Sequence, residues 1–269
     1  MITLYVLGSG SRGNCCAVES DGVALLIDAG FSAREVERRA TSIGLDVGRI
    51  AGIALTHEHG DHSCGAANLA RRLGVPVLTA PGTWQRLSTA KAEPEHRALG
   101  LCTRVELGPF VVEACPTSHD AAEPLAIVAR GAGGTSVGVA YDLGRPTSAV
   151  RYLLRGLTAL VLEANHDEVQ LRTSDYPPVV QRRIAGSGGH LSNRAAAELL
   201  AQLHHPGLSI VVLAHLSAQC NTAADARAAV APALKRVGFD GVLYIADQDE
   251  PLGPILVAPS EGIQFGLAL

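Results

Sequence analysis

The sequence predicts an α/β fold in which two mixed β-sheets lie between outer layers of helices. Short apolar runs typical of strands alternate with amphipathic helical segments near both ends of the 269-residue chain, and the middle is rich in strands. The two halves mirror each other in this pattern, as expected of two sheets that pack face to face. The sequence contains no long Pro/Gly/Ser-rich linker, so we expect a single domain over residues 1–269.

Composition limits the classes of protein to which the chain can belong. Hydrophobic residues make up 47% of the chain and charged residues 18%, which excludes a disordered protein. Aromatic residues are 4%, so we expect a core of Ala, Val, Leu and Ile. The formal net charge of −4 excludes a uniformly basic nucleic-acid-binding surface but allows a local basic patch.

The sequence also bears on where the protein works. It has no run of about 18 or more apolar residues, so we expect no membrane-spanning helix and no membrane partner. The first seven residues lack the positive charge and cleavage site of a signal peptide and are typical of a strand. The six cysteines form no CxxC pair and are expected to be reduced, which favours a cytoplasmic protein.

Turn, cap and breaker residues set the boundaries of the first elements. Asp21-Gly22 is a strong hairpin signal between two short runs, and the segment SARE that begins at Ser32 is a capping box. Glycines end the helices that follow. The predicted strands are 2–7, 15–20, 23–28, 50–56 and 75–79; the predicted helices are 33–43, 61–73 and 81–87.

The remaining elements follow from the same signals. Gly-rich turns separate two pairs of strands in the middle of the chain, after which helices and strands alternate again. The predicted strands are 104–107, 110–114, 125–130, 135–141, 159–162, 209–214 and 242–245, with 254–257 at a sheet edge; the predicted helices are 148–155, 193–204 and 223–237.

The segment HEHGDH, directly after a predicted buried strand, offers four metal ligands within six residues. Imidazole and carboxylate groups suit divalent zinc, iron or manganese. Alternate side chains, His57 and His59, can face one point, Gly60 permits a turn, and Asp61 and His62 can face a second point. A polar loop with internally satisfied histidines is the alternative, and four ligands so close together disfavour it.

The HxHxDH motif at a strand-to-helix junction resembles the signature of the metallo-β-lactamase fold, an αββα sandwich. The resemblance covers nearly the whole chain, because four further residues at predicted strand ends match the pattern. It implies that one metal ion is held by His57, His59 and His119, and a second by Asp61, His62 and His215, with Asp142 as a bridge. Asp28 would orient a ligand rather than bind metal; the alternative for Asp28 is a turn or cap role.

By this resemblance the cofactor is a pair of divalent metal ions, zinc, manganese or iron. Asp61, Asp142 and a bridging hydroxide would leave such a pair with a net positive charge, which favours an anionic substrate such as a phosphodiester. The bridging hydroxide would be the nucleophile, because metal binding lowers the pKa of water.

Two later segments are similar to those of ribonuclease Z. Glu163 follows a predicted strand and His190 opens a predicted helix, and in that family such a pair protonates the leaving oxygen. The alternative is that His190 only caps or packs, and the role of His166 stays open. Only 20 residues lie between Asp142 and Glu163, which leaves no room for the long tRNA-binding arm of ribonuclease Z, and the interval from Asp142 to His215 lacks the clamp domain of ribonuclease J.

The compact WalJ/YycJ family matches best, on the segments GSGSRGN, DAGF, THEH, NHD and GHLSN. Its members are described as metal-dependent, exonuclease-like hydrolases that act on DNA. The chain departs from the family around Cys220. Surface arginines and the opening Gly-rich loop could contact substrate phosphates, although ordinary surface and loop roles are the alternative. These weaker candidates are Ser9, Arg12, Asn14, Arg182, Arg183 and Arg194.

We therefore expect a dinuclear metal-dependent phosphodiesterase, a nuclease with DNA as the favoured substrate, in which Asp61, Glu163 and His190 act in catalysis. A phosphodiesterase for small cyclic or nucleotide diesters is one alternative, and a non-catalytic regulatory or binding protein is another. The sequence does not predict which metal is bound, whether DNA or RNA is cleaved, the polarity of cleavage, or the oligomeric state.

Overall fold

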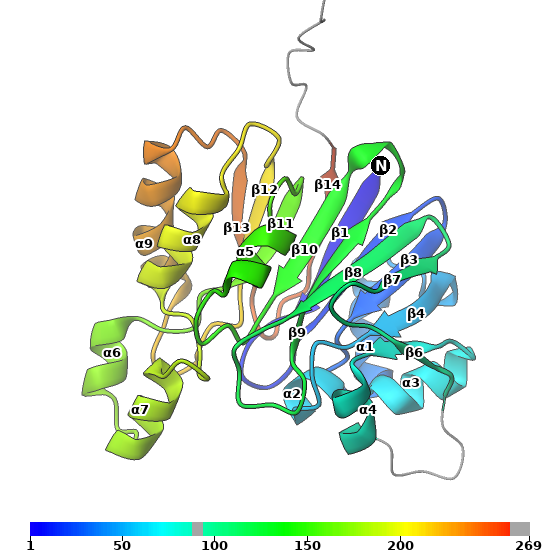
Figure 1. Ribbon diagram of the computed structural model, residues 1–269, viewed down its shortest axis with the longest axis horizontal. Coiled ribbons are helices and arrows are strands. Elements are labelled where there is room, and N and C mark those ends of the chain that lie inside the picture. The colour runs from blue at the N-terminus through cyan, green and yellow to red at the C-terminus, as the bar shows by residue number, and fades with distance from the viewer. Residues whose placement is uncertain (88–93, 259–269) are drawn as a thin grey trace, which may run out of the picture.

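The computed structural model describes residues 1–87 and 94–258 of the chain. Its strands form two seven-stranded mixed sheets that pack face to face, and helices cover both outer faces (Figure 1). This arrangement confirms the predicted sandwich of two sheets between helical layers. Within the described ranges, no helix is long and apolar enough to cross a membrane.

The first sheet joins the two ends of the described chain. Its early strands are antiparallel and those from β3 onward are parallel, and β14 pairs antiparallel with β1 at the edge, as expected for the last apolar segment. In spatial order the strands are β14 (Leu252–Val257), β1 (Ile2–Gly8), β2 (Cys15–Ser20), β3 (Val23–Ile27), β4 (Ile50–Ala54), β5 (Val77–Thr79) and β6 (His96–Ala98).

The second sheet has the same mixed character. Strands β7 to β10 are antiparallel and β10 to β13 are parallel. In spatial order the strands are β13 (Val242–Ile245), β12 (Ile210–Ala214), β11 (Ala159–Glu163), β10 (Ser136–Ala140), β9 (Leu125–Arg130), β8 (Phe110–Pro116) and β7 (Arg104–Leu107).

Nine α-helices occur in the described ranges, and most of them cover the outer faces of the sheets. Two of them, α6 and α7, form a lobe that projects from the body of the molecule (Figure 1). The helices are α1 (Ala33–Ser42), α2 (Gly60–Ser63), α3 (Ala66–Leu73), α4 (Pro81–Leu87), α5 (Ser148–Leu153), α6 (Glu168–Thr173), α7 (Pro178–Ala185), α8 (Asn193–Leu203) and α9 (Ala223–Arg236).

Three aliphatic clusters hold the layers together. The largest lies between the sheets and includes Leu4 and Ile27 from the first sheet and Val139 and Val161 from the second. A second cluster packs the outer face of the second sheet against α5, α8 and α9. The third packs the outer face of the first sheet against α1 and α3. Burial of this aliphatic area, as the composition predicts, is the main force that stabilises the sandwich.

The structure corrects the sequence expectation in one helix and adds three elements. The helix predicted over 61–73 is two helices, α2 and α3, because the main-chain N–H of Gly65 donates to the oxygen of Ala29 (2.9 Å) and not to that of Asp61, as a continuous helix would require. Strand β6 and helices α6 and α7 were not predicted. Gly60 adopts no left-handed conformation, so the turn at the motif does not require glycine there.

Candidate metal centre

The candidate metal centre lies where several strands of both sheets end. Three of its residues, Asp28, Asp142 and His215, stand just past β3, β10 and β12 and adopt left-handed backbone conformations, with φ of 61°, 52° and 56°. Asp and His tolerate this conformation better than most residues, although it still costs about 1–3 kcal/mol. Each strand thus ends in a sharp turn that aims a side chain at one point between the sheets.

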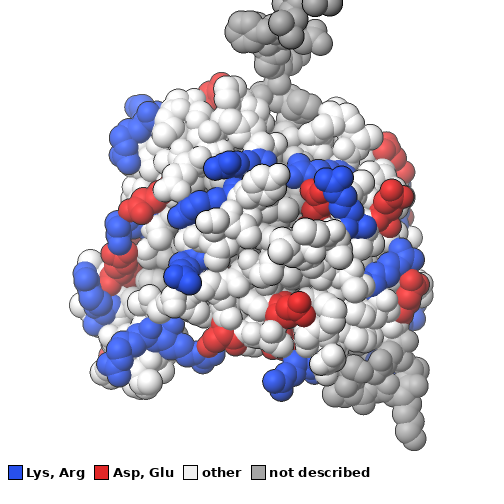
Figure 2. All heavy atoms as spheres, viewed as in Figure 1, with Lys and Arg blue, Asp and Glu red and all other residues white. Residues whose placement is uncertain are grey.

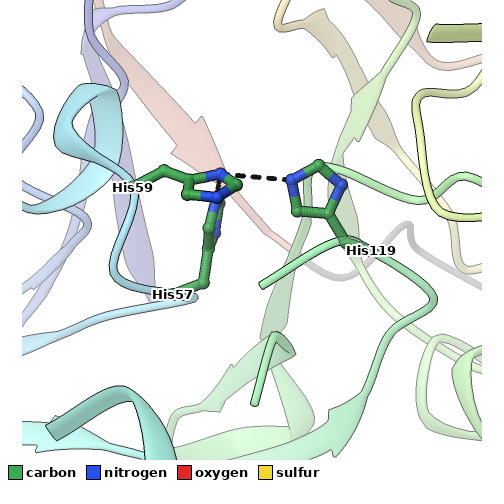
Figure 3. Close-up of side chains that lie close together, drawn as sticks. All are labelled: His57, His59 and His119. Atoms are coloured by element: carbon green, nitrogen blue, oxygen red, sulfur yellow. Dashed lines mark hydrogen bonds between the residues drawn. The ribbon is translucent and has the colours of Figure 1, made fainter. Parts of the chain in front are cut away.

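Three histidines form the first part of the centre. His57 and His59 follow β4, and His119 follows β8. Figure 3 shows His59 facing His119, with His57 beside them. The Nδ1 atom of His59 lies 3.0 Å from Nε2 of His57 and 3.3 Å from Nε2 of His119. Two nitrogens bound to one tetrahedral zinc ion lie about 3.3 Å apart, so these three atoms are spaced as ligands of one ion would be.

The second part of the centre consists of Asp61, His62 and His215. The Oδ2 atom of Asp61 lies 3.5 Å from Nε2 of His62 and 3.5 Å from Nε2 of His215. Asp142 lies between the two parts, because its Oδ2 atom is 3.0 Å from Nε2 of His62 and 3.6 Å from Nε2 of His57. The structure therefore brings together all seven residues that the resemblance assigns to the metal ions.

In three of these histidines, the Nδ1 atom lies within hydrogen-bond distance of an oxygen atom. His62 donates from Nδ1 to Asp28 (2.7 Å), and His119 donates from Nδ1 to the main-chain oxygen of Gly189 (3.1 Å). The Thr56 hydroxyl donates to Asp28 (2.8 Å) and can accept from Nδ1 of His57 (3.0 Å). Metal-binding histidines in proteins are oriented in this way.

The donor set fits a pair of divalent cations. The Oδ2 atom of Asp142 and the Nε2 atom of His215 are buried and have no hydrogen-bond partner. Unpaired buried polar atoms are costly, and bound cations would satisfy these two. Imidazole nitrogens and carboxylate oxygens in this number suit zinc, manganese or iron.

Glu163 and His190 lie beside the ligand set. Nδ1 of His190 is 2.8 Å from Glu163 and 2.9 Å from Asp142, and the His190 side chain is 23% exposed. Glu163 is fully buried and also accepts hydrogen bonds from the main-chain nitrogens of Leu143 and Leu191. Burial alone would lower the pKa of His190, but the two carboxylates raise it to about 10.

The structure separates the weaker phosphate candidates into two groups. Ser9 and Asn14 are buried. The Ser9 hydroxyl accepts a hydrogen bond from the main-chain nitrogen of His215 (2.8 Å), and the main-chain nitrogen of Asn14 donates to the main-chain oxygen of Asp61 (2.7 Å). These residues therefore hold the loops of the centre and are not open to substrate. The four arginines are exposed, and Arg183 lines the cleft at the centre. Arg12 pairs with Asp249, and Arg194 pairs with Glu168 and Glu198.

Sequence reasoning assigned no role to two residues that support the centre. Thr56 contacts Asp28 and His57, as described above, and Asn165 donates from Nδ2 to the main-chain oxygen of His215 (2.9 Å). Thr56 and Asn165 each stand within two residues of a candidate site residue. This closeness in the sequence was the one signal that could have pointed to their supporting role. His166 is buried and, together with His190, lines a second cavity that none of the seven candidate ligands lines.

Replacing Asp28 by asparagine is expected to weaken metal binding by about 10- to 100-fold. Asparagine tolerates the left-handed backbone but removes the negative charge that faces Nδ1 of His62. Competition with a chelator measures the change in affinity. Asp46→Asn is the matched control, since exposed Asp46 lies at the start of a short helical turn and contacts none of the candidate ligands. Equal metal affinity in both variants would contradict the orienting role of Asp28.

A second prediction concerns Gly30, which packs on the loop of Asp61. A Cβ atom at Gly30 would lie 1.7 Å from the main-chain oxygen of Asp61, whereas one at Gly60 would meet nothing within 4 Å. Gly30→Ala is therefore expected to lower the free energy of unfolding by about 1–3 kcal/mol, and to weaken metal binding. Thermal unfolding with and without metal measures both effects, with Gly60→Ala as the control. Equal melting temperatures in the two variants would contradict this packing.

The family model described as Beta-lactamase superfamily domain matches residues 24–216. The chain belongs to the beta-lactamase superfamily. Membership confirms the resemblance inferred from the HxHxDH motif and the strand-end residues. In the solved structure of the metallo-beta-lactamase fold protein YhfI from Bacillus subtilis, the same fold is found with a TM-score of 0.68 at 18% identity, over 93% of this chain and 98% of that one.

Two relatives in the superfamily match most of the chain. The exodeoxyribonuclease YycJ of Bacillus anthracis is 33% identical over 237 residues, which cover 87% of this chain and 89% of the relative. The exodeoxyribonuclease WalJ of Streptococcus pneumoniae is 28% identical over 221 residues, which cover 80% of this chain and 82% of the relative. The expected likeness to the WalJ/YycJ family is confirmed, and the chain is a hydrolase of this superfamily.

Proposed function

We propose that this protein is a dinuclear metal-dependent phosphodiesterase that acts as an exonuclease on DNA. The observation that carries the proposal is the 33% identity, over 87% of this chain, with the B. anthracis relative named an exodeoxyribonuclease. The close approach of His190 to the candidate ligand set supports it. Proton donation beside a pair of metal ions is the chemistry that cleavage of a phosphodiester requires.

Each proposed ion has its own set of ligands. His57, His59 and His119 hold one, and Asp61, His62 and His215 hold the other, in agreement with two of the groups whose ligand atoms lie within 4.8 Å of one another. Asp142 stands between them. When bound, the two cations supply Lewis-acid stabilisation of a phosphoryl group and lower the pKa of water.

The charge of the ligand set favours an anionic substrate. Only two of the seven proposed ligands, Asp61 and Asp142, are carboxylates, so they leave two divalent cations with a net positive charge. A phosphodiester anion is attracted to such a site. The cleft at the centre has a volume of about 230 Å³ and is lined by His59, Asp61, His119 and His190.

His190 is the proposed proton donor. Its Nδ1 atom is held by Glu163 and Asp142, which leaves Nε2 to give a proton to the leaving oxygen. Glu163 fixes the ring and stabilises its protonated form. Because Glu163 is itself held by two main-chain N–H groups, the pair is positioned before substrate arrives.

The test uses protein loaded with manganese or zinc, an end-labelled single strand of DNA, the same strand closed into a circle, and bis-p-nitrophenyl phosphate. The expected result is hydrolysis of the small diester and stepwise shortening of the linear strand, while the circle is resistant. Cleavage of the small diester alone favours the small-molecule phosphodiesterase. Protein with two bound metal ions that hydrolyses neither substrate would refute the proposal.

A further inference from the structure

A second cavity adjoins the metal centre. Residues of α6, α7 and the first turn of α8 line it, together with His166 and His190. Its volume is about 340 Å³, and none of the seven candidate metal ligands lines it. His190 also lines the cleft at the metal centre, so the two cavities share the proposed proton donor as a wall.

His166 is a buried polar residue of this cavity. It is 2% exposed, and its Nδ1 atom has no hydrogen-bond partner among the described residues. Its backbone is fixed, because its main-chain oxygen accepts from the main-chain nitrogen of Asn193 (2.9 Å) and it forms a β-bridge with Ser192. A buried imidazole nitrogen without a partner is costly, so a ligand that hydrogen-bonds to this ring would remove the cost.

The charges that line the cavity favour an anion. Glu168 is the one carboxylate of the lining, and Arg194, which also contacts Glu198, neutralises it (2.9 Å). Arg172 lines the cavity from α6, is exposed, and takes part in none of the ion pairs found among the described residues. Figure 2 shows Lys and Arg side chains at the lower left, where Figure 1 places α6 and α7. The positive charge of Arg172 is therefore uncompensated.

The start of α8 adds to this positive potential. Ser192 caps the 11-residue helix by accepting from the main-chain nitrogen of Ala195 (3.2 Å), and its own hydroxyl donates to Glu168 (3.0 Å). Ser192, Arg194 and Ala195 all line the cavity. Helix N-termini carry partial positive charge and are common binding sites for phosphate groups.

The position of the cavity relates it to the proposed reaction. A proton passes from His190 to the leaving oxygen only if the scissile diester lies within hydrogen-bond reach of the ring. A nucleic-acid strand carries a phosphate at every nucleotide, so a neighbouring phosphate follows close to the scissile one. The cavity on which His190 also borders is where we expect that phosphate.

We propose that His166 and Arg172, with the first turn of α8, form a second phosphate subsite, which binds the phosphate next to the scissile diester. The inference rests on the proposed function and deepens it, because it names the group that positions the strand. The terminal phosphate of a strand and the next internal phosphodiester share this chemistry, and modified DNA distinguishes them.

The first test replaces Arg172 by alanine. Loss of a phosphate contact is expected to raise KM for linear DNA about 10-fold, and to reduce the slope of log KM against log salt concentration by about 0.7–0.9. Arg172→Lys keeps the charge and is expected to keep the slope. His166→Ala is expected to raise KM about 10-fold as well, because it removes the hydrogen bond to the phosphate.

The second test changes the DNA, in single-stranded and duplex form. The probes carry a terminal phosphate or a hydroxyl at each end in turn, or an uncharged methylphosphonate at the second linkage from each end. Loss of the recognised phosphate is expected to raise KM of the wild type about 10-fold and to have no further effect in Arg172→Ala. A response to the terminal phosphate identifies the monoester, and a response to the second linkage identifies the internal diester.

Arg34→Ala is the matched control. Arg34 is exposed on α1, takes part in no ion pair found in the described part of the chain, and lines neither cavity. If Arg172→Ala kept the KM and the salt slope of this control, or if every modified probe affected the wild type and Arg172→Ala equally, the subsite would be overturned while the proposed function stands. Wild-type protein that cleaves no DNA overturns both, so the wild-type assay separates the two failures.

Discussion

Replacing Asp142 by asparagine is expected to reduce phosphodiester hydrolysis by on the order of 10³-fold and to reduce the amount of bound metal. The Oδ2 atom of Asp142 is buried without a hydrogen-bond partner and lies 3.0 Å from Nε2 of His62. The loss of its charge would leave each proposed cation with one anionic ligand fewer. Steady-state kinetics and metal analysis on the same preparation measure both effects.

The matched control is Asp167→Asn. Asp167 follows β11, the strand that ends with Glu163, and caps α6 by accepting hydrogen bonds from two main-chain nitrogens, a role that asparagine fills equally well. This variant is expected to keep its metal and its activity. If Asp142→Asn retained two ions and the rate of the wild type, the bridging position of Asp142 would be refuted.

Replacing His190 by alanine is expected to slow DNA hydrolysis about 10²- to 10⁴-fold while metal binding is retained. The alkoxide that leaves from DNA needs a proton, whereas p-nitrophenolate leaves readily without one. The variant should therefore lose much less activity on bis-p-nitrophenyl phosphate than on DNA. The ratio of the two rates separates proton donation from a general loss of structure.

Glu163→Gln is the companion variant. It removes the charge that faces Nδ1 of His190, while an amide oxygen can still accept from the main-chain nitrogen of Leu143 or Leu191. It is expected to show the same selective loss on DNA, to a smaller degree. If His190→Ala lost activity equally on both substrates, the proton-donor role would be wrong.

The sandwich could be predicted from the sequence because its strands and its large helices have strong local signals. Strands β2 (Cys15–Ser20), β7 (Arg104–Leu107) and β13 (Val242–Ile245) have the predicted boundaries, since Gly-containing turns or short apolar runs delimit them. The candidate ligands follow strand ends, and strand ends were the most readable feature of the chain. Their meeting in one centre could therefore be predicted from the sequence.

Other features depend on contacts between distant segments and carry no local signal. The break between α2 and α3 comes from the hydrogen bond that the main-chain N–H of Gly65 donates to the oxygen of Ala29, far earlier in the chain. Ser9 and Asn14 stand in a Gly-rich loop that resembles a phosphate-binding loop, but hydrogen bonds to the loops of His215 and Asp61 occupy them. Helix α7 has only eight residues and buries none of them, so it was not predicted, although two of its residues, Val180 and Ile184, line the cleft.

The most direct test of the metal centre is anomalous diffraction from crystals of the protein grown with manganese or zinc. The expected result is two peaks between the sheets. One would be bounded by His57, His59 and His119 and the other by Asp61, His62 and His215, with the Asp142 carboxylate between them. A single peak, or peaks bound by other side chains, would contradict the proposed dinuclear centre.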